Sequence, residues 1–225
     1  MGKYLRLFEE YNRNIFLRLL MTLGICLLIL EGYYFVNDNL DHKVDLALPL
    51  DSMIPYWPWT SFFYFSLYFM YLTVAVKVDS QRYTQLLLDI VMMTMISFIC
   101  FALITSHYPR PDPSEWAHSI WKPIIDHMVK VDSPGNTCPS LHVSTSIYIS
   151  LTMRFSPRAR LWMIWGVLVS LSTLTMKQHF VWDWVGGVIL ASLVIFIQPW
   201  TGRWIKSLRD HGIDESVSSE NSPHA

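Results

Sequence analysis

The amino-acid sequence predicts an all-α integral membrane protein built as a bundle of six transmembrane helices. Apolar residues make up 52% of the 225 residues and are gathered into long blocks with charged segments between them. Several blocks approach the roughly 20 residues that a helix needs to cross a bilayer. Phe, Trp and Tyr together reach 15%, which is typical of the aromatic belts at membrane interfaces.

The predicted spans differ in length and composition. The second begins with an aromatic cluster at residues 55–59, which suits an interface. The fourth and fifth are short, and the fourth is rich in hydroxyl side chains. A soluble bundle explains the pattern less well, because the second and sixth blocks resemble lipid-spanning segments. The six predicted spans cover approximately residues 15–35, 54–76, 87–106, 140–155, 161–176 and 180–199.

The distribution of positive charge predicts the orientation of these spans. With a cytoplasmic N-terminus, most of the 17 Lys and Arg residues fall on the cytoplasmic side, as the positive-inside rule requires. We therefore expect both termini to be cytoplasmic and the active site to be extracytoplasmic, in a plasma or inner membrane. The outer segments hold only Lys43, Arg110, Lys122, Lys130 and Lys177.

The chain is predicted to form one domain. Residues 1–209 would make up the six-helix domain, with its catalytic motifs in residues 110–187. The first apolar block is interpreted as a retained helix and not a signal peptide, because no small-residue cleavage site follows it. Residues 210–225 are polar and lack periodicity, so a disordered cytoplasmic tail is predicted there.

Charge and cysteine content argue against several functions. A formal net charge of −1 provides no basic face for nucleic acid. Three scattered cysteines do not form a disulfide framework, and Cys138 is expected to have a packing or loop role. No Cys/His group has the spacing of zinc ligands, so neither a metal nor another cofactor is predicted. The sequence leaves the oligomeric state open.

Two histidines and a carboxylate lie at the ends of apolar blocks, where polar side chains are costly without a function. His179 and Asp183 are four residues apart, so on one helix they would share a face. His179 is the predicted nucleophile that would carry a phosphoryl group, and Asp183 would orient its ring. His142 would protonate the leaving oxygen and then activate the acceptor hydroxyl.

The negative charge of a phosphate also needs partners. Ser140 and the backbone N–H groups up to His142 lie at a predicted helix start, where anions are attracted. Arg110 in the outer loop and Lys177 near His179 are the predicted cationic partners. Alone, each of these residues also fits a solvated, capping or packing role.

These motifs resemble the membrane branch of the type 2 phosphatidic acid phosphatase superfamily, whose soluble relatives are vanadium haloperoxidases. Arg110-Pro111 is similar to the end of the first family motif, and Pro139-Ser140-Leu141-His142 to the second. The segment Ser172-x6-His179-x3-Asp183 is similar to the third family motif. The resemblance implies a phosphorylated His179, a partner in Asp183 and a general acid in His142.

The chain also departs from the family pattern. The family lysine falls at Leu103 and the arginine of the third motif at Thr173, and Lys177 is a candidate substitute if the helix continues that far. Leu141 replaces a glycine in the second motif. Within the superfamily, the motifs are most similar to the inositol phosphorylceramide synthase-like group. That similarity implies a lipid alcohol as a second candidate acceptor beside water.

The predicted function is that of a lipid-phosphate phosphatase that needs no metal and acts through a phosphohistidine. Its partners would be the bilayer and a membrane lipid phosphate. A head-group phosphotransferase with the same site is one alternative. The other is a non-catalytic lipid-binding membrane protein, which the two missing cations favour and the three retained catalytic residues disfavour.

Overall fold

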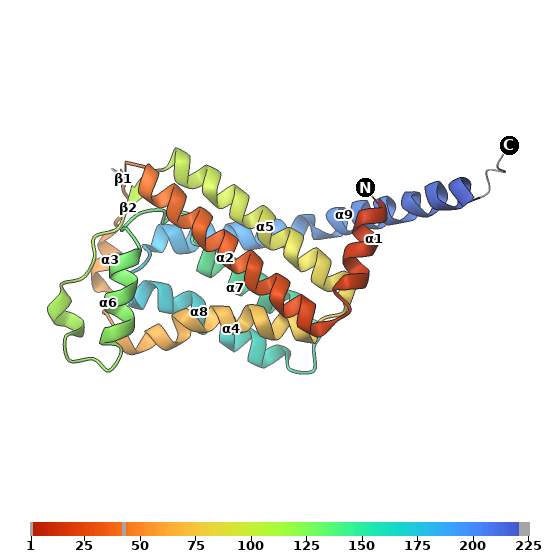
Figure 1. Ribbon diagram of the computed structural model, residues 1–225. Coiled ribbons are helices and arrows are strands. Elements are labelled where there is room, and N and C mark those ends of the chain that lie inside the picture. The colour runs from red at the N-terminus through yellow and green to blue at the C-terminus, as the bar shows by residue number, and fades with distance from the viewer. Residues whose placement is uncertain (1, 42–43, 221–225) are drawn as a thin grey trace.

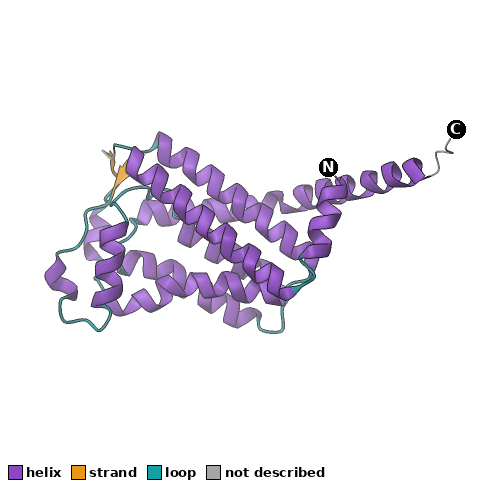
Figure 2. Ribbon diagram, in the orientation of Figure 1, coloured by secondary structure: helices purple, strands orange, loops and turns teal. Residues whose placement is uncertain are grey.

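The computed structural model describes residues 2–41 and 44–220, and most of these residues are helical (Figure 2). Three short 3-10 turns and one parallel pair of two-residue strands complete the described structure. The elements are α1 (Gly2–Tyr11), α2 (Ile15–Asn39), β1 (Val44–Asp45), α3 (Pro49–Met53), η1 (Pro58–Thr60), α4 (Ser61–Lys77), α5 (Ser80–Leu103), β2 (Ser106–His107), η2 (Pro113–Trp116), α6 (Lys122–Val131), α7 (Leu141–Thr152), η3 (Met153–Phe155), α8 (Ala159–Thr175) and α9 (Val181–Glu220).

The long helices lie alongside one another in a bundle with two distinct ends (Figure 1). Helix α1 and the distal part of α9 extend from one end. The short helices α3 and α6 and the β1–β2 pair cover the other end. The described parts of both terminal regions therefore lie at the same end, opposite the loop that leads from α5 to α7.

Four helices are long and apolar enough to cross a membrane: α2, α4 together with η1, α5, and the part of α9 up to Ser207. The helical fold class is confirmed, but the count of six spans is not. The fourth and fifth predicted spans are helices, yet α7 has 12 residues and α8 has 17. Helix α7 is short because its cap Ser140 fixes the start and the turn η3 follows Thr152.

Burial explains the hydroxyl-rich composition of α7. Val143, Ser146, Tyr148 and Ile149 are buried among α4, α5, α8 and α9. Ser144, Ser146 and Ser150 donate to carbonyl groups one turn back in the helix, as Ser146 Oγ does to Val143 O at 3.2 Å. A central helix enclosed by protein does not have to match the full bilayer thickness, because its ends meet protein groups.

Caps and prolines set the ends of the longer helices. The Asp79 carboxylate accepts from the Arg82 N–H at 2.9 Å, so α5 starts earlier than predicted. Helix α9 continues through Pro199 to Glu220, into the segment for which the sequence predicts disorder. The predicted boundary at residue 209 therefore does not coincide with a helix end, and residues 221–225 lie outside the described residues.

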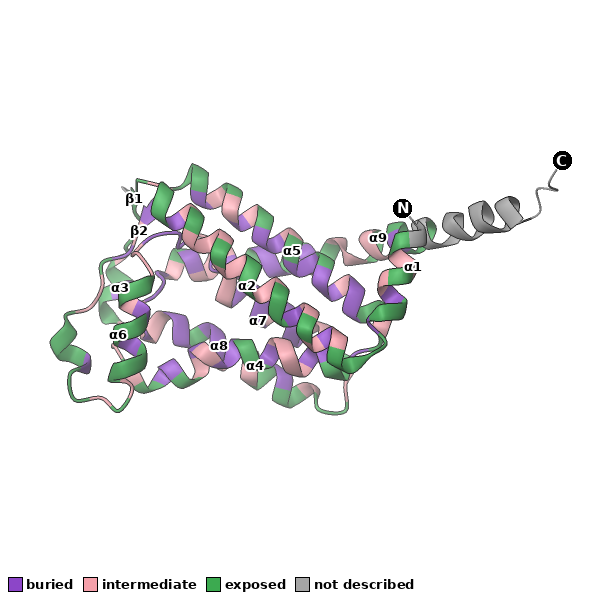
Figure 3. Ribbon diagram, in the orientation of Figure 1, coloured by how far each residue is buried: buried purple, intermediate pink, exposed green. Residues whose placement is uncertain are grey.

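The outer faces of the bundle are apolar. Leu28 on α2, Ile99 on α5, Leu161 on α8 and Phe196 on α9 are all more than half exposed. Figure 3 shows exposed, intermediate and buried residues recurring along each of the long helices. Large exposed apolar surfaces mark contact with a partner or a membrane, and here they cover helices of membrane-spanning length.

Candidate active site

The predicted motifs meet where α7 and α9 begin. Ser140 is the N-cap of α7, and its Oγ accepts from the Val143 N–H at 3.3 Å. The Ser140 N–H donates to the Asp183 carbonyl oxygen at 3.1 Å, which joins the two helix starts. The side-chain Oγ and the backbone N–H of Ser140 thus both have partners within the protein. The backbone N–H groups of Leu141 and His142 are the donors left for an anion at this helix start.

A glycine allows the two helices to approach this closely. A Cβ added at Gly187 would lie 2.8 Å from the Ser140 carbonyl oxygen and 2.8 Å from the Val143 Cβ. Real Cβ atoms essentially never come so near to such atoms. Gly187 therefore fixes the distance between the start of α7, which bears His142, and the start of α9, which bears Asp183.

His179 and Asp183 are adjacent, but not in the way the spacing predicts. The sequence places both on one helix, whereas His179 lies in the turn before α9 and Asp183 in its first turn. The Asp183 Oδ2 accepts from the Phe180 N–H at 2.8 Å, and this bond caps the helix after His179. The same Oδ2 lies 3.6 Å from His179 Nδ1, and the Asp183 side chain is fully buried.

The geometry leaves reactive atoms of both histidines available. His179 Nδ1 faces Asp183, so Nε2 is the nitrogen left to meet a substrate. His142 stacks on Tyr64 with ring centroids 4.0 Å apart and an angle of 16° between the planes. Within the described residues His142 Nε2 has no hydrogen-bond partner. An unpartnered buried polar atom calls for an explanation, and a ligand is one.

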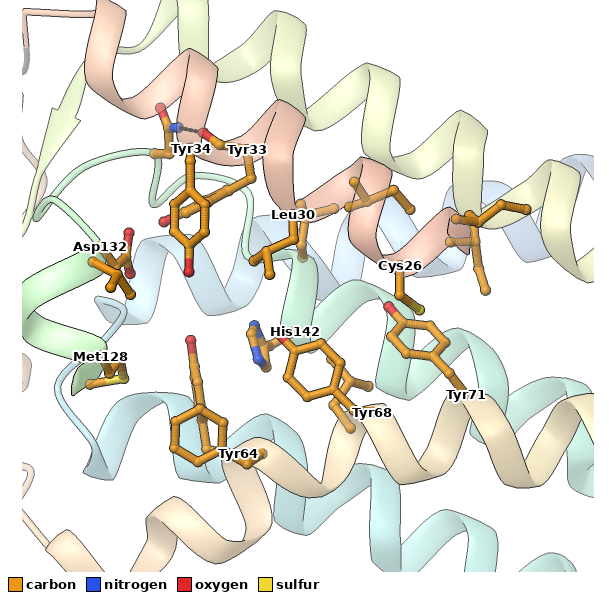
Figure 4. A pocket seen from close by; sticks show the side chains of 18 of the residues that line it. Cys26, Leu30, Tyr33, Tyr34, Tyr64, Tyr68, Tyr71, Met128, Asp132 and His142 are labelled. Atoms are coloured by element: carbon orange, nitrogen blue, oxygen red, sulfur yellow. Dashed lines mark hydrogen bonds between the residues drawn. The ribbon is translucent and has the colours of Figure 1, made fainter. Parts of the chain in front are cut away.

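Both histidines line a large cavity. It has a volume of about 550 Å³, is enclosed mainly by apolar residues of α2, α4 and α5, and is bounded at one end by α6. Figure 4 shows His142 beside it, with the Tyr34 and Tyr64 hydroxyls and the Asp132 carboxylate around the same space. A second, small polar pocket of about 20 Å³ is lined by His179 together with Arg110, Asp132 and Gln178.

Arg110 reaches this site from the outer loop. Its Nη2 donates to the Asp132 carbonyl at 2.9 Å and lies 3.3 Å from Asp132 Oδ2, and Nη1 contacts Gln178 Oε1. The buried Nε has no partner within the described residues. Burial raises the pKa of the Asp132 carboxyl, and the neighbouring Arg110 charge opposes that rise. Arg110 therefore lines the small pocket together with His179, and its guanidinium is already paired with a carboxylate.

Lys177 is directed elsewhere. Helix α8 ends at Thr175, and Lys177 adopts a left-handed backbone with φ 53°. The helix therefore does not continue to Lys177, although the predicted substitution of Lys177 for the family arginine at Thr173 depends on that continuation. Its Nζ donates to the Asp51 carbonyl oxygen at 2.6 Å. Partial burial lowers the pKa of Lys177, while the charge of Asp51 raises it.

The positions of the missing family cations are not part of the cavity. Leu103 is 78% exposed at the end of α5. Thr173 is buried in α8, where its carbonyl oxygen accepts from the backbone N–H groups of Gln178 and His179. Lys177 does not line either cavity in this structure, and among the described residues that line them Arg110 is the one Lys or Arg.

Sequence reasoning missed several residues of the site. Asp51 accepts from the Val181 N–H at 2.8 Å and so supports the start of α9. Tyr64 supports His142, while Asp132 and Gln178 hold Arg110. The outer loop that contains Asp132 is rich in Pro and Asp, but no local spacing singles out Asp132. In the part of the chain that the structure describes, no group of three or more His, Cys, Asp and Glu could hold a metal ion.

Fold and site define an all-helical membrane protein with an arrangement suited to phosphate chemistry. The chain belongs to the PAP2 superfamily: the model of that superfamily matches residues 85–206, more than half of the 225 residues. Members of the superfamily are phosphoric ester hydrolases, which supports a general phosphatase activity. The comparisons with curated proteins and with solved structures found no match. The family that the motifs indicate is confirmed, and the inositol phosphorylceramide synthase-like branch stays a prediction.

Proposed function

We propose that this protein transfers the phosphate group of a membrane lipid through a covalent intermediate on His179. The observation that supports this most strongly is the joint placement of His142 and His179 on one apolar cavity, with Asp183 behind His179. A lipid tail fits the apolar part of such a cavity, and its volume lies within the range of about 300–1,000 Å³ that ligand sites occupy.

In the first step, His179 Nε2 attacks phosphorus and the bond from phosphorus to the leaving oxygen breaks. Asp183, whose Oδ2 lies 3.6 Å from His179 Nδ1, stabilises the positive charge that develops on the imidazole. His142 donates its proton to the leaving oxygen, which departs as an alcohol. Tyr64 holds the His142 ring in place by stacking.

The developing negative charge has donors on two sides. The Leu141 and His142 N–H groups point from the start of α7, and Arg110 offers its unpartnered Nε. Fixed donors of this kind act most strongly where water is excluded, because they need no reorganisation during the reaction. The three groups together replace the larger set of cations that the family motifs imply.

In the second step, an acceptor gives its proton to His142 and attacks the phosphorus, which restores His179. With water as acceptor the protein is a lipid-phosphate phosphatase. With an alcohol it is a head-group phosphotransferase of the inositol phosphorylceramide synthase type. The third alternative, a non-catalytic lipid-binding protein, would retain lipid binding without turnover.

The fold also supports the proposed topology. The site lies at the end of the bundle opposite α1 and the distal part of α9 (Figure 1), as cytoplasmic termini and an extracytoplasmic site require. Four helices satisfy the length of a span, and the enclosed α7 and the partly exposed α8 would complete six if both cross the membrane. A plasma or inner membrane remains the proposed location.

The test uses purified protein in detergent with EDTA and a panel of phospholipid, prenyl and lysophosphate donors, with and without inositol. Free phosphate from the wild type, lost in His179→Ala, would support the phosphatase. Transfer to inositol, lost in the same variant, would support the phosphotransferase. Turnover that survives in His179→Ala would overturn the proposed mechanism, and lipid binding without turnover in the wild type would favour the non-catalytic alternative.

A further inference from the structure

Asp132 places a carboxylate beside the proposed phosphate position. It follows α6 and lines both the large cavity and the small polar pocket, each of which also contains His179. Its Oδ1 accepts from Asn37 Nδ2 at 3.0 Å, and its Oδ2 lies 3.3 Å from Arg110 Nη2. Donors therefore face both carboxylate oxygens, which is the pattern of an ionised acid.

This carboxylate changes the charge balance of the site. Among the described residues that line the two cavities, Arg110 is the single Lys or Arg. Asp132 neutralises it at 3.3 Å, and Lys177 donates to the Asp51 carbonyl oxygen instead of facing the cavity. Asp183 adds a further negative charge behind His179. With the proton that His142 carries before the first step, two positive charges stand against two negative ones. The site thus offers an anion hydrogen-bond donors without a surplus of positive charge.

The charge of the substrate decides how unfavourable its binding beside Asp132 is. A phosphomonoester carries a charge of about −1.5 to −2 at neutral pH, whereas a phosphodiester carries a single negative charge. A second negative charge beside the largely buried Asp132 would face strong repulsion without a further cation to compensate it. The singly charged ester fits donors such as the Leu141 and His142 N–H groups.

We infer that Asp132 is a specificity-determining residue that makes this site select singly charged lipid phosphodiesters over doubly charged monoesters. The inference rests on the proposed function. In the reaction, His179 Nε2 forms a bond to phosphorus and one ester oxygen leaves with a proton from His142. The intermediate keeps the other ester group. An acceptor hydroxyl returns a proton to His142 as it takes the phosphorus, and His179 is released.

The test compares two lipid-like donors that both release a nitrophenolate. Dodecyl para-nitrophenyl phosphate is a singly charged diester, and para-dodecyl-ortho-nitrophenyl phosphate is a doubly charged monoester. We expect the wild type to have at least a tenfold higher kcat/KM for the diester. Asp132→Asn should shift the ratio toward the monoester by about tenfold, since it removes the repelling charge. Asp132→Glu keeps the charge and should keep the preference.

Asp126→Asn is the matched control. Asp126 is an exposed carboxylate on α6 that pairs with Lys122 at 2.5 Å, so its loss should leave the ratio unchanged. A purely structural role of Asp132 would lower both kcat/KM values together and leave their ratio intact, which would overturn the inference. A wild type that prefers the monoester would overturn it too, while the proposed function would stand if His179→Ala abolished turnover of both donors.

Binding gives a readout that does not depend on turnover. Dodecyl methyl phosphate and dodecyl phosphate differ by one ionisable group and can be titrated calorimetrically into the detergent-solubilised protein. Tighter binding of the methyl diester to the wild type, with the difference reduced in Asp132→Asn, would support the inference. Equal or tighter binding of dodecyl phosphate to the wild type would overturn it.

Discussion

Asp183 Oδ2 lies 3.6 Å from His179 Nδ1 and accepts the Phe180 N–H at 2.8 Å. One carboxylate oxygen therefore both caps α9 and faces the proposed nucleophile. This dual role explains why His179 is well placed although it lies in a turn and not on the helix. The cap fixes the backbone after His179, whose Nδ1 faces Asp183 while its side chain lines the cavity.

Asp183→Asn should separate these two roles. The amide oxygen can still accept the Phe180 N–H, so we expect the thermal unfolding midpoint to change little. The loss of negative charge beside His179 Nδ1 should lower kcat by about a thousandfold or more, as in other histidine–aspartate pairs. Steady-state kinetics and a thermal melt check both parts, and near wild-type kcat would contradict the assigned role of Asp183.

Gly187→Ala should disturb the junction of α7 and α9. The added Cβ would lie 2.8 Å from the Ser140 carbonyl oxygen, so the helices must move apart. We expect a loss of stability of about 1–3 kcal/mol, which is typical of overpacking, and a marked loss of activity.

Gly24→Ala provides the control for that change. A Cβ at Gly24 in α2 would meet nothing within 4 Å, and alanine favours a helix over glycine. This variant should unfold at the same temperature as the wild type or higher. If both alanine variants behaved alike, Gly187 would not set the distance between the helices.

Tyr64 should act through its ring. Tyr64→Phe keeps the stacking with His142. Tyr64→Ala removes this ring contact, in which the Tyr64 and His142 ring centroids are 4.0 Å apart. Because such pairs contribute about 0.5–1.5 kcal/mol, we expect kcat to fall by about tenfold in the alanine variant and much less in the phenylalanine variant. Equal losses would indicate that the hydroxyl, and not the ring, supports the reaction.

Cys138 should be a poor nucleophile. Burial, aided by the negative charge of Asp183, raises the pKa of the Cys138 thiol to about 12. Since the thiolate is the reactive form and a free cysteine has a pKa of about 8.5, alkylation near pH 8 should be about a thousandfold slower than for a free thiol. Iodoacetamide labelling of a variant that retains only Cys138, native and then denatured, checks this. Fast labelling of the native protein would contradict the buried environment.

The sequence predicted the parts of the site that depend on local patterns. The helical class, the cap Ser140 and the proximity of His179 to Asp183 follow from short spacings and apolar blocks, and the structure contains all three. The helix on which both residues were expected is absent at His179, because the cap by Asp183 starts α9 only at Val181.

Contacts between distant segments could not be predicted in the same way. Lys177 donates to the Asp51 carbonyl oxygen, 126 positions away, and the left-handed turn that directs it there has no sequence signal such as glycine. Tyr64 and Asp132 reach the site from α4 and the outer loop, and only the packing of the bundle brings them to His142 and Arg110.

The most direct test of the central claim is to trap the intermediate on His179. A lipid donor labelled at phosphorus would be mixed with the wild type and with His179→Ala, and each reaction would be stopped in alkali. We predict a protein-bound label in the wild type that survives alkali and is released by mild acid, as a phosphohistidine requires, and none in the variant. An equally labelled variant, or rapid turnover by a wild type that never acquires the label, would contradict the account.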